Sequence, residues 1–311
     1  MNHLGEIISL AVAVSWTFSA WYADKASRRI GSMVTNVIRL FLATVFLGLL
    51  LWMTIGHPYP AYADGKAWGW LALSALVGYV FGDYCLFNCY VCIGPRFGQL
   101  LMTLAPPSAA IAGWFLLGES LSWKYWLAMA VTLTGIAISI LNKGEGHRLN
   151  LSLPAKGILL GIGAGVGQGV GLVLSKVGME CYSSALPSDV PKAAVDVLPF
   201  ASTMIRAIVG GAGFFLLLTL QKGLGNLKAA FHDRKGMRYA TLLTIFGPAL
   251  GVSLSLMAVR YSDAGIASTL MALTPVLIII PDTLINKHPV RLKELAGVAV
   301  TMLGVAMFFL L

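Results

Sequence analysis

The chain has 311 residues, of which 58% are hydrophobic and only 11% are charged, and its mean hydropathy is +0.80. This composition excludes a large soluble domain and indicates a protein whose surroundings are mostly lipid. A net charge of +9 would suggest nucleic-acid binding in a soluble protein, but here the basic residues lie in short segments between apolar runs, where they set membrane topology. We therefore expect no nucleic-acid partner.

The first apolar run begins next to Met1 and is followed by Lys25, Arg28 and Arg29. It lacks a preceding basic segment and a convincing cleavage site, so we interpret it as a retained first helix. At about 20 apolar residues per membrane crossing, the whole chain divides into ten predicted spans. These spans cover residues 4–22, 31–54, 67–91, 96–118, 123–142, 156–177, 198–220, 238–260, 264–286 and 292–311.

Residues of the first half recur in the second half at a constant separation of 169 positions. The recurring pairs are Gly78 with Gly247, Gly82 with Gly251, Pro106 with Pro275, Thr132 with Thr301, and Gly135 with Gly304. Because each half holds an odd number of spans, the second must be inverted relative to the first. We therefore predict an all-α integral membrane protein with ten transmembrane helices in two inverted five-helix repeats, residues 1–143 and 154–311.

Three residues of the predicted helix interiors are candidates for substrate binding. Trp16 lies mid-span in the first helix, where it either faces lipid or forms a cavity wall that stacks on a ligand. Arg39 and Arg206 lie in matching places in the second and seventh helices. Paired guanidinium groups could capture a phosphate or carboxylate, and the alternative is a helix-anchoring or ion-pair role.

The third helix carries Asp83 near mid-membrane, beside a face of small residues. An acid at that depth is costly unless it is paired or wetted. It is our leading candidate for proton binding or for recognising a cationic group, and the alternative is an ion pair with Arg39. Asp282, near the end of the ninth helix, is a second candidate. We interpret the small-residue face, which includes Cys85 and Cys89, as a packing seam and expect no metal, because no histidine joins the cysteines.

In the sixth helix, glycine occupies every second position from Gly161 to Gly171. These glycines fall on two nearly opposite helix faces, so a neighbour can approach closely on either side. Gln168 is the one strong hydrogen-bonding side chain among them, and it serves either substrate binding or a helix–helix hydrogen bond. Asn88 and Gln99 offer further polar groups from the third and fourth helices. We expect Trp16 and Gln168 to be symmetry mates across a central cavity.

A family resemblance rests on a motif around the fourth and fifth helices. Its residues are Leu104-Ala105-Pro106, Leu117-Gly118-Glu119-Ser120-Leu121, Trp126 and Gly135. The pattern resembles the EamA-type repeat of the drug/metabolite transporter superfamily. Leu273-Thr274-Pro275 recurs in the second half, but His288 stands where Glu119 would be repeated. The resemblance implies transport as a class, and a cavity built mainly from helices 1, 3, 4, 6, 8 and 9.

We find no catalytic, ATP-binding or cofactor-binding motif, and we do not expect an enzyme or a cofactor. Our interpretation is a secondary transporter that exports small or amphipathic metabolites by alternating access, with or without proton coupling. Pro106 and Pro275 would let the fourth and ninth helices bend at gates. A lipid or lipid-linked-precursor flippase is the alternative, and a membrane assembly or regulatory subunit without flux is the alternative from another class.

Topology follows from the distribution of Lys and Arg. The loops after odd-numbered predicted spans, together with the adjoining span ends, hold fifteen, and those after even-numbered spans hold five. This distribution predicts both termini outside the cytoplasm. The family resemblance implies the opposite orientation. We expect a bacterial inner-membrane protein, monomeric or weakly dimeric, whose partners are membrane lipids and a small-molecule or lipid substrate.

Overall fold

The computed structural model describes residues 3–141, 154–277 and 292–310, and these residues form a bundle of helices with no strand among them. Seven helices in this part of the chain are long and apolar enough to cross a membrane, and two shorter apolar helices accompany them. The protein is therefore an all-α, multi-pass membrane protein, as predicted, while the count of ten spans stays a prediction.

The first half opens with two long helices separated by one glycine. Its elements are α1 (Leu4–Ile30), α2 (Ser32–Ile55), α3 (Gly65–Ala75), the π-helix η1 (Leu76–Asp83), α4 (Tyr84–Met102), α5 (Ala105–Leu117) and α6 (Trp123–Leu141). The predicted end of the first helix at residue 22 is wrong, because α1 continues to Gly31, whose φ of 82° favours glycine. Arg28 and Arg29 thus belong to the last helical turn.

The predicted boundary between the third and fourth helices is also wrong. The helix that starts at Gly65 passes through η1 and α4 to Met102, and the chain turns only at residues 103 and 104. Pro106 does not interrupt a helix internally, because it lies in the first turn of α5. The missing N–H of a proline costs nothing at that position.

The second half repeats this break. Its elements are α7 (Ala155–Ala185), α8 (Lys192–Asp196), α9 (Leu198–Leu220), α10 (Leu224–Ala230), α11 (Arg234–Thr244), η2 (Ile245–Val252), α12 (Ser253–Tyr261), α13 (Ala264–Met271), α14 (Thr274–Leu277) and α16 (Leu292–Leu310). Residues 272 and 273 separate α13 from α14, and Pro275 follows as the second residue of α14. Each half therefore contains a turn followed by its repeated proline.

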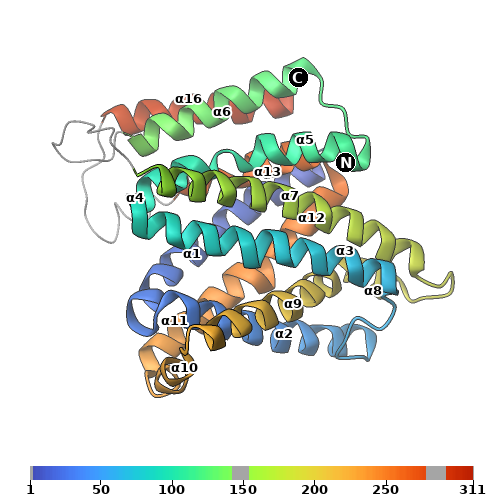
Figure 1. Cartoon of the computed structure of the whole chain (residues 1–311). Coiled ribbons are helices and arrows are strands. Elements are labelled where there is room, and N and C mark those ends of the chain that lie inside the picture. Colours follow the sequence, from blue (N-terminus) through green and yellow to red (C-terminus); the bar gives the residue numbers. More distant parts are fainter. Residues whose placement is uncertain (1–2, 142–153, 278–291, 311) are drawn as a thin grey trace.

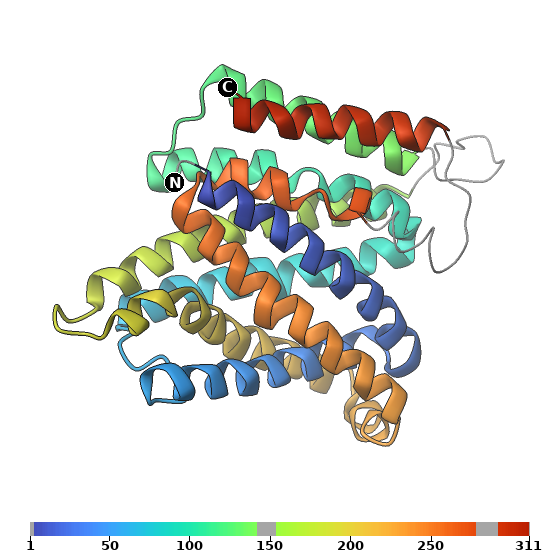
Figure 2. The same ribbon diagram turned by 180° about the vertical axis from the view of Figure 1, so that it is seen from behind.

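Helices at corresponding places in the two halves pack against each other. In Figures 1 and 2, α6 and α16 lie side by side along one edge of the bundle, and α2 and α9 pair near the opposite edge. A side chain at Gly135 would collide with Thr301, and one at Gly304 would collide with Thr132. Such reciprocal contacts are expected if a two-fold axis relates the halves, which stays a prediction.

The core between the halves is built around α7. A Cβ at Gly165 would lie 2.8 Å from the carbonyl oxygen of Leu101, and one at Gly171 would lie 2.7 Å from Cα of Gly78. The two glycine faces of α7 therefore pack against α4–α5 on one side and η1 on the other. Cys85 is a free, buried thiol near this contact. The largest buried apolar cluster takes residues from both halves.

Candidate substrate site

The two π-helices occupy the same place in each half. The bounds of η1 and η2 differ by 169 residues, so the repeat extends to this unusual local structure. A π-helix shifts backbone hydrogen bonding from the α-helical pattern and is often found at functional sites. The helices of the opposite half supply side chains to both segments, which makes this region the candidate site.

Gln168 of α7 contacts η1. Its Nε2 donates a hydrogen bond to the carbonyl oxygen of Gly78 at 3.0 Å and another to Oδ1 of Asp83 at 2.7 Å. Its amide also lies against Gly82, where an added Cβ would come within 3.2 Å of Nε2. Of the two roles weighed for Gln168, the structure shows the helix–helix hydrogen bond.

Trp16 and Ser15 of α1 make the corresponding contacts with η2. Ser15 Oγ donates to the carbonyl oxygen of Phe246 at 2.7 Å. The indole of Trp16 lies against Gly251, where an added Cβ would come within 2.6 Å of the ring. Since Gly251 is the repeat partner of Gly82, Trp16 and Gln168 occupy corresponding positions. Their roles in substrate binding stay predictions.

Asp83 is the centre of a buried polar cluster. Its Oδ2 accepts a hydrogen bond from Nη2 of Arg39 at 2.5 Å, so the ion pair weighed from the sequence is present. With Gln168 on the other oxygen, the carboxylate is held from both halves of the chain. The side chains of Arg39 and Asp83 are 17% and 11% exposed, so this contact is largely shielded from solvent.

Arg206 enters the same cluster from α9. Its guanidinium carbon lies 4.5 Å from the ring centroid of Tyr79, a residue of η1, in a cation–π contact. Three buried polar atoms here have no hydrogen-bond partner among the described residues, namely Nε of Arg39, Nε of Arg206 and the hydroxyl of Tyr79. Buried polar groups in folded proteins normally have hydrogen-bond partners, so these three atoms are the groups of the cluster that could donate to a ligand.

Several predicted residues do not join this cluster. The Nδ2 of Asn88 donates to the carbonyl oxygen of Tyr84 in its own helix at 2.8 Å. The side chain of Gln99 and all of Asp282 lie outside the described residues. Pro106 and Pro275 lie at the repeated turns rather than beside Asp83.

A second charged cluster, which sequence reasoning missed, lies near the ends of α5 and α12. Lys176 of α7 pairs with Oε1 of Glu119 at 2.5 Å and donates to the carbonyl oxygen of Ser262 at 2.9 Å. The predicted end of the sixth helix at residue 177 placed Lys176 at a helix end, whereas α7 continues to Ala185. A lysine inside an apolar run was the available signal.

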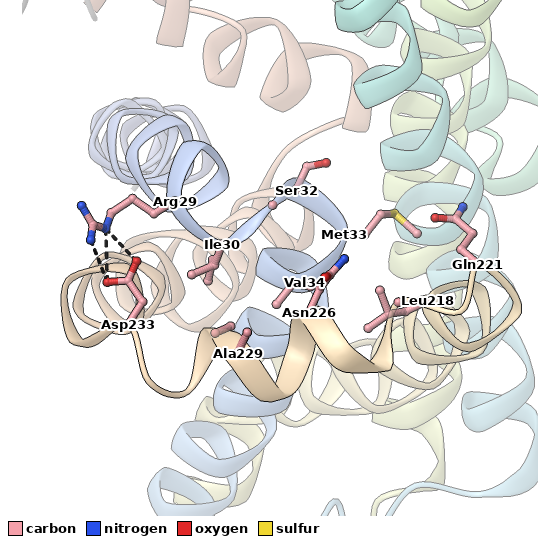
Figure 3. A pocket seen from close by; sticks show the side chains of 13 residues that line it. Arg29, Ile30, Ser32, Met33, Val34, Leu218, Gln221, Asn226, Ala229 and Asp233 are labelled. Carbon is pink, nitrogen blue, oxygen red and sulfur yellow. Dashed lines mark hydrogen bonds and ion pairs between the residues drawn. The ribbon is translucent and has the colours of Figure 1, made fainter.

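A hollow of about 530 Å³ opens at the other end of the bundle (Figure 3). It lies where the end of α1 and the start of α2 meet α9 and α10, and polar side chains such as Gln221 and Asn226 line it. Arg29 and Asp233 close one side with an ion pair of 2.8 Å. None of the predicted substrate residues lines this hollow, so we place the candidate site at the buried cluster around Asp83.

Comparison with known proteins gives consistent matches. A model of the EamA-like transporter family matches residues 3–141 and again residues 155–310. The uncharacterized inner membrane transporter YedA of Escherichia coli is 28% identical over 149 residues, so the alignment spans about half of this relative, 46% of its length and 46% of the present chain. The uncharacterized transporter sll0355 of Synechocystis sp. is 24% identical over 287 residues, which are 88% of this chain and 82% of the relative.

The fold also matches a solved structure, described only as a crystal structure of a protein. That chain superposes with a TM-score of 0.76 at 15% sequence identity, and the match covers 100% of the present chain and 98% of the other. At this identity the likeness establishes the fold alone.

Proposed function

The chain belongs to the EamA-like transporter family and is an integral membrane transporter, and we propose that it is a secondary transporter working by alternating access. Its substrates in this proposal are small or amphipathic metabolites, which it exports across a bacterial inner membrane. The path lies between the two halves, at the buried cluster around Asp83.

One observation supports this location above all. Asp83 of the first half binds Arg39 of its own half and Gln168 of the other. In alternating access, the two repeats change their mutual positions around a fixed site. A carboxylate held by both halves must then change its hydrogen bonds during the cycle, so it can couple ligand binding to the movement.

Proton coupling follows from the same contacts. A protonated Asp83 carries no charge, so its attraction for Arg39 would be weakened and the contact between η1 and α2 loosened. Asp83 is therefore the proposed proton carrier, with Asp282 as the second candidate. The repeated turns before Pro106 and Pro275 are the proposed gates, because chain breaks at symmetric places let short helix segments rotate.

Counterflow in liposomes tests the proposal. A thermal-shift screen of the purified protein would first identify metabolites that bind. Liposomes containing the protein and loaded with unlabelled compound should then transiently accumulate labelled compound from outside, because alternating access exchanges substrates one at a time.

Two outcomes would contradict the proposal. Fluorescent phospholipid that crosses the bilayer only when the protein is present, without metabolite counterflow, would favour the flippase. Ligand binding without flux of metabolite or lipid would favour an assembly or regulatory subunit. Protein-free liposomes are the control.

A further inference from the structure

Arg206 is a buried cation for which no direct ion pair is found among the described residues. The residue is 4% exposed, and its Nε has no hydrogen-bond partner among the described residues. The carboxylate of the same cluster, Asp83, is already paired with Arg39. An arginine does not lose its proton in proteins, so it cannot avoid the cost of burial by becoming neutral. The ring of Tyr79 offsets only part of that cost, because its face offers a quadrupole rather than a full charge.

The unpartnered atoms around Arg206 need a hydrogen-bond acceptor rather than a further donor. Both carboxylate oxygens of Asp83 are already used, one by Arg39 and one by Gln168. The unpartnered atoms are Nε of Arg39, Nε of Arg206 and the hydroxyl of Tyr79, all of which can donate. A substrate ammonium group would add further donors, whereas a carboxylate would supply the missing acceptors.

We infer that this site binds the carboxylate of an organic monoanion, with Arg206 as its main cationic ligand and the Tyr79 hydroxyl as an additional donor. The inference rests on the proposed function, in which the bound anion is the transported substrate. The charge balance favours one negative charge, because the cluster holds two arginines and one carboxylate, that of Asp83. Arg206 lies on the ring of Tyr79, and Arg39 binds Asp83 four residues further along η1, so the three donors meet at one π-helix.

The body of this anion should be apolar. In η2, the positions that repeat Tyr79 and Asp83 are Pro248 and Val252, so the second half presents no charge there. The indole of Trp16 lies on that segment. Because η2 also packs against α2 and α9, which carry the two arginines, the proposed site has a positively charged side and an apolar side.

Ligand-induced thermal shifts of the purified protein test the inference. The probes are matched triplets on one carbon skeleton at equal ionic strength: phenylacetate, phenylacetamide and phenethylamine, and hexanoate, hexanamide and hexylamine. We expect a carboxylate, but neither its amide nor its amine, to raise the unfolding temperature of the wild-type protein. Arg206→Gln should weaken this binding at least tenfold, and Arg206→Lys should restore part of it.

The matched control is Arg260→Gln, which removes another second-half arginine whose Nη1 donates to the carbonyl oxygen of Val195. This variant should bind the carboxylate as the wild type does. Should Arg206→Gln fail to fold, Tyr79→Phe still tests the site, because it removes only the unpartnered hydroxyl and keeps the ring against Arg206. We expect Tyr79→Phe to weaken carboxylate binding several-fold.

The inference is wrong if no carboxylate raises the unfolding temperature of the wild-type protein, or if the amide or the amine raises it equally. It is wrong as well if the carboxylate raises the unfolding temperature of Arg206→Gln as much as that of the wild type. It is also wrong if dioleoylphosphatidylglycerol alone gives the Arg206-dependent shift, because the anion would then be a lipid phosphate. Counterflow of a neutral or cationic metabolite would leave the proposed function standing and remove only this inference. Arg206-dependent carboxylate binding without any flux would support this inference and contradict the proposed transport.

Discussion

Oε2 of Glu119 accepts a hydrogen bond from the backbone N–H of Ala264 at 2.9 Å, and this contact joins the two halves of the chain. Glu119 lies two residues after the end of α5, and Ala264 is the first residue of α13. The other carboxylate oxygen pairs with Lys176. One side chain thus caps a helix of the opposite half and neutralises a buried lysine, at the end of the bundle near the N-terminus (Figure 1).

Glu119→Gln should destabilise the protein through Lys176. The amide still offers an oxygen to Ala264, but it leaves the largely buried ammonium group without its counter-charge. Breaking a buried pair from one side costs about 3–5 kcal/mol. We expect a clear fall in the unfolding temperature in detergent, and recovery of most of it in the double variant Glu119→Gln/Lys176→Met.

Arg29→Gln is the matched control for that experiment. It breaks the ion pair with Asp233, whose partners are far more exposed, so the loss should be much smaller. Equal losses in the two single variants would mean that the Glu119–Lys176 contact does not fasten the halves together.

Asp83→Asn should abolish uphill transport driven by a pH gradient while leaving binding or downhill exchange partly intact. The amide cannot carry the proton, yet it retains a hydrogen-bonding oxygen for Arg39. The measurement is flux in liposomes with and without an imposed pH gradient. Persistent dependence on the gradient would move coupling elsewhere, with Asp282 next in line.

A folding defect must be separated from loss of coupling in that variant. Arg39→Gln/Asp83→Asn removes both charges and so leaves no unpaired cation from this ion pair. We expect the double variant to unfold at a temperature closer to that of the wild type than Asp83→Asn does, and to remain uncoupled.

Alanine at Gln168 should weaken apparent substrate affinity about tenfold, because it removes two hydrogen bonds that hold η1 in place. Alanine at Trp16 should have a similar effect by removing the side chain that lies on η2. The amount of folded protein should change little. Apparent affinity is measured by counterflow at increasing substrate concentration, and folded protein by size-exclusion chromatography.

Thr134→Ala serves as the control for these truncations, since the Thr134 hydroxyl donates only to the carbonyl oxygen of Ala130 in its own helix. Its affinity should match that of the wild type. Poor folding of the Trp16 and Gln168 variants with unchanged affinity per folded molecule would show that both residues are packing elements.

A cysteine at Asn226 should resist an impermeant maleimide added to intact cells. The excess of Lys and Arg on the loops that include residues 221–237 predicts that this segment faces the cytoplasm. Asn226 lies in α10 and is exposed, so burial would not explain a lack of reaction. The native cysteines are removed first, and labelling after permeabilisation is the control. Ready labelling of intact cells would reverse the orientation.

Stability should depend on pH through Asp263, which lies between α12 and α13. Burial, and next the nearby Glu119 carboxylate, raises the pKa of Asp263 above its ordinary value. The folded protein therefore binds this proton more tightly than the unfolded chain does. The stabilisation is complete below the ordinary pKa and is lost as the pH rises through the raised one.

Asp263→Asn should remove this dependence and raise the unfolding temperature near neutral pH, because asparagine needs no proton to stay neutral. Asparagine is also accepted at a helix N-cap, the position that Asp263 holds before α13. The measurement is the unfolding temperature between pH 4 and 8 for the variant and the wild type. Parallel curves would show that Asp263 does not titrate in this range.

The sequence by itself determined the features that depend on residues close together in the chain or on the internal repeat. Apolar runs of membrane length predict helices in lipid. The 169-residue repeat places Gly78 and Gly247 at matching positions, and in the structure these two glycines lie in η1 and η2. An acid and an arginine inside apolar runs were recognisable because each is costly there, so Asp83 and Arg39 could be named together before their contact was seen.

Only the tertiary structure decided which of these groups meet. Arg39 and Arg206 look equivalent in the repeat, yet one binds Asp83 and the other faces the ring of Tyr79, because they approach η1 from different helices, α2 and α9. Glu119 follows α5 and Lys176 lies in α7, far apart in the chain, and no local periodicity indicates their contact. Hydrophobicity and helix phase are properties of neighbouring residues, whereas the pairing of buried charges depends on how whole helices pack.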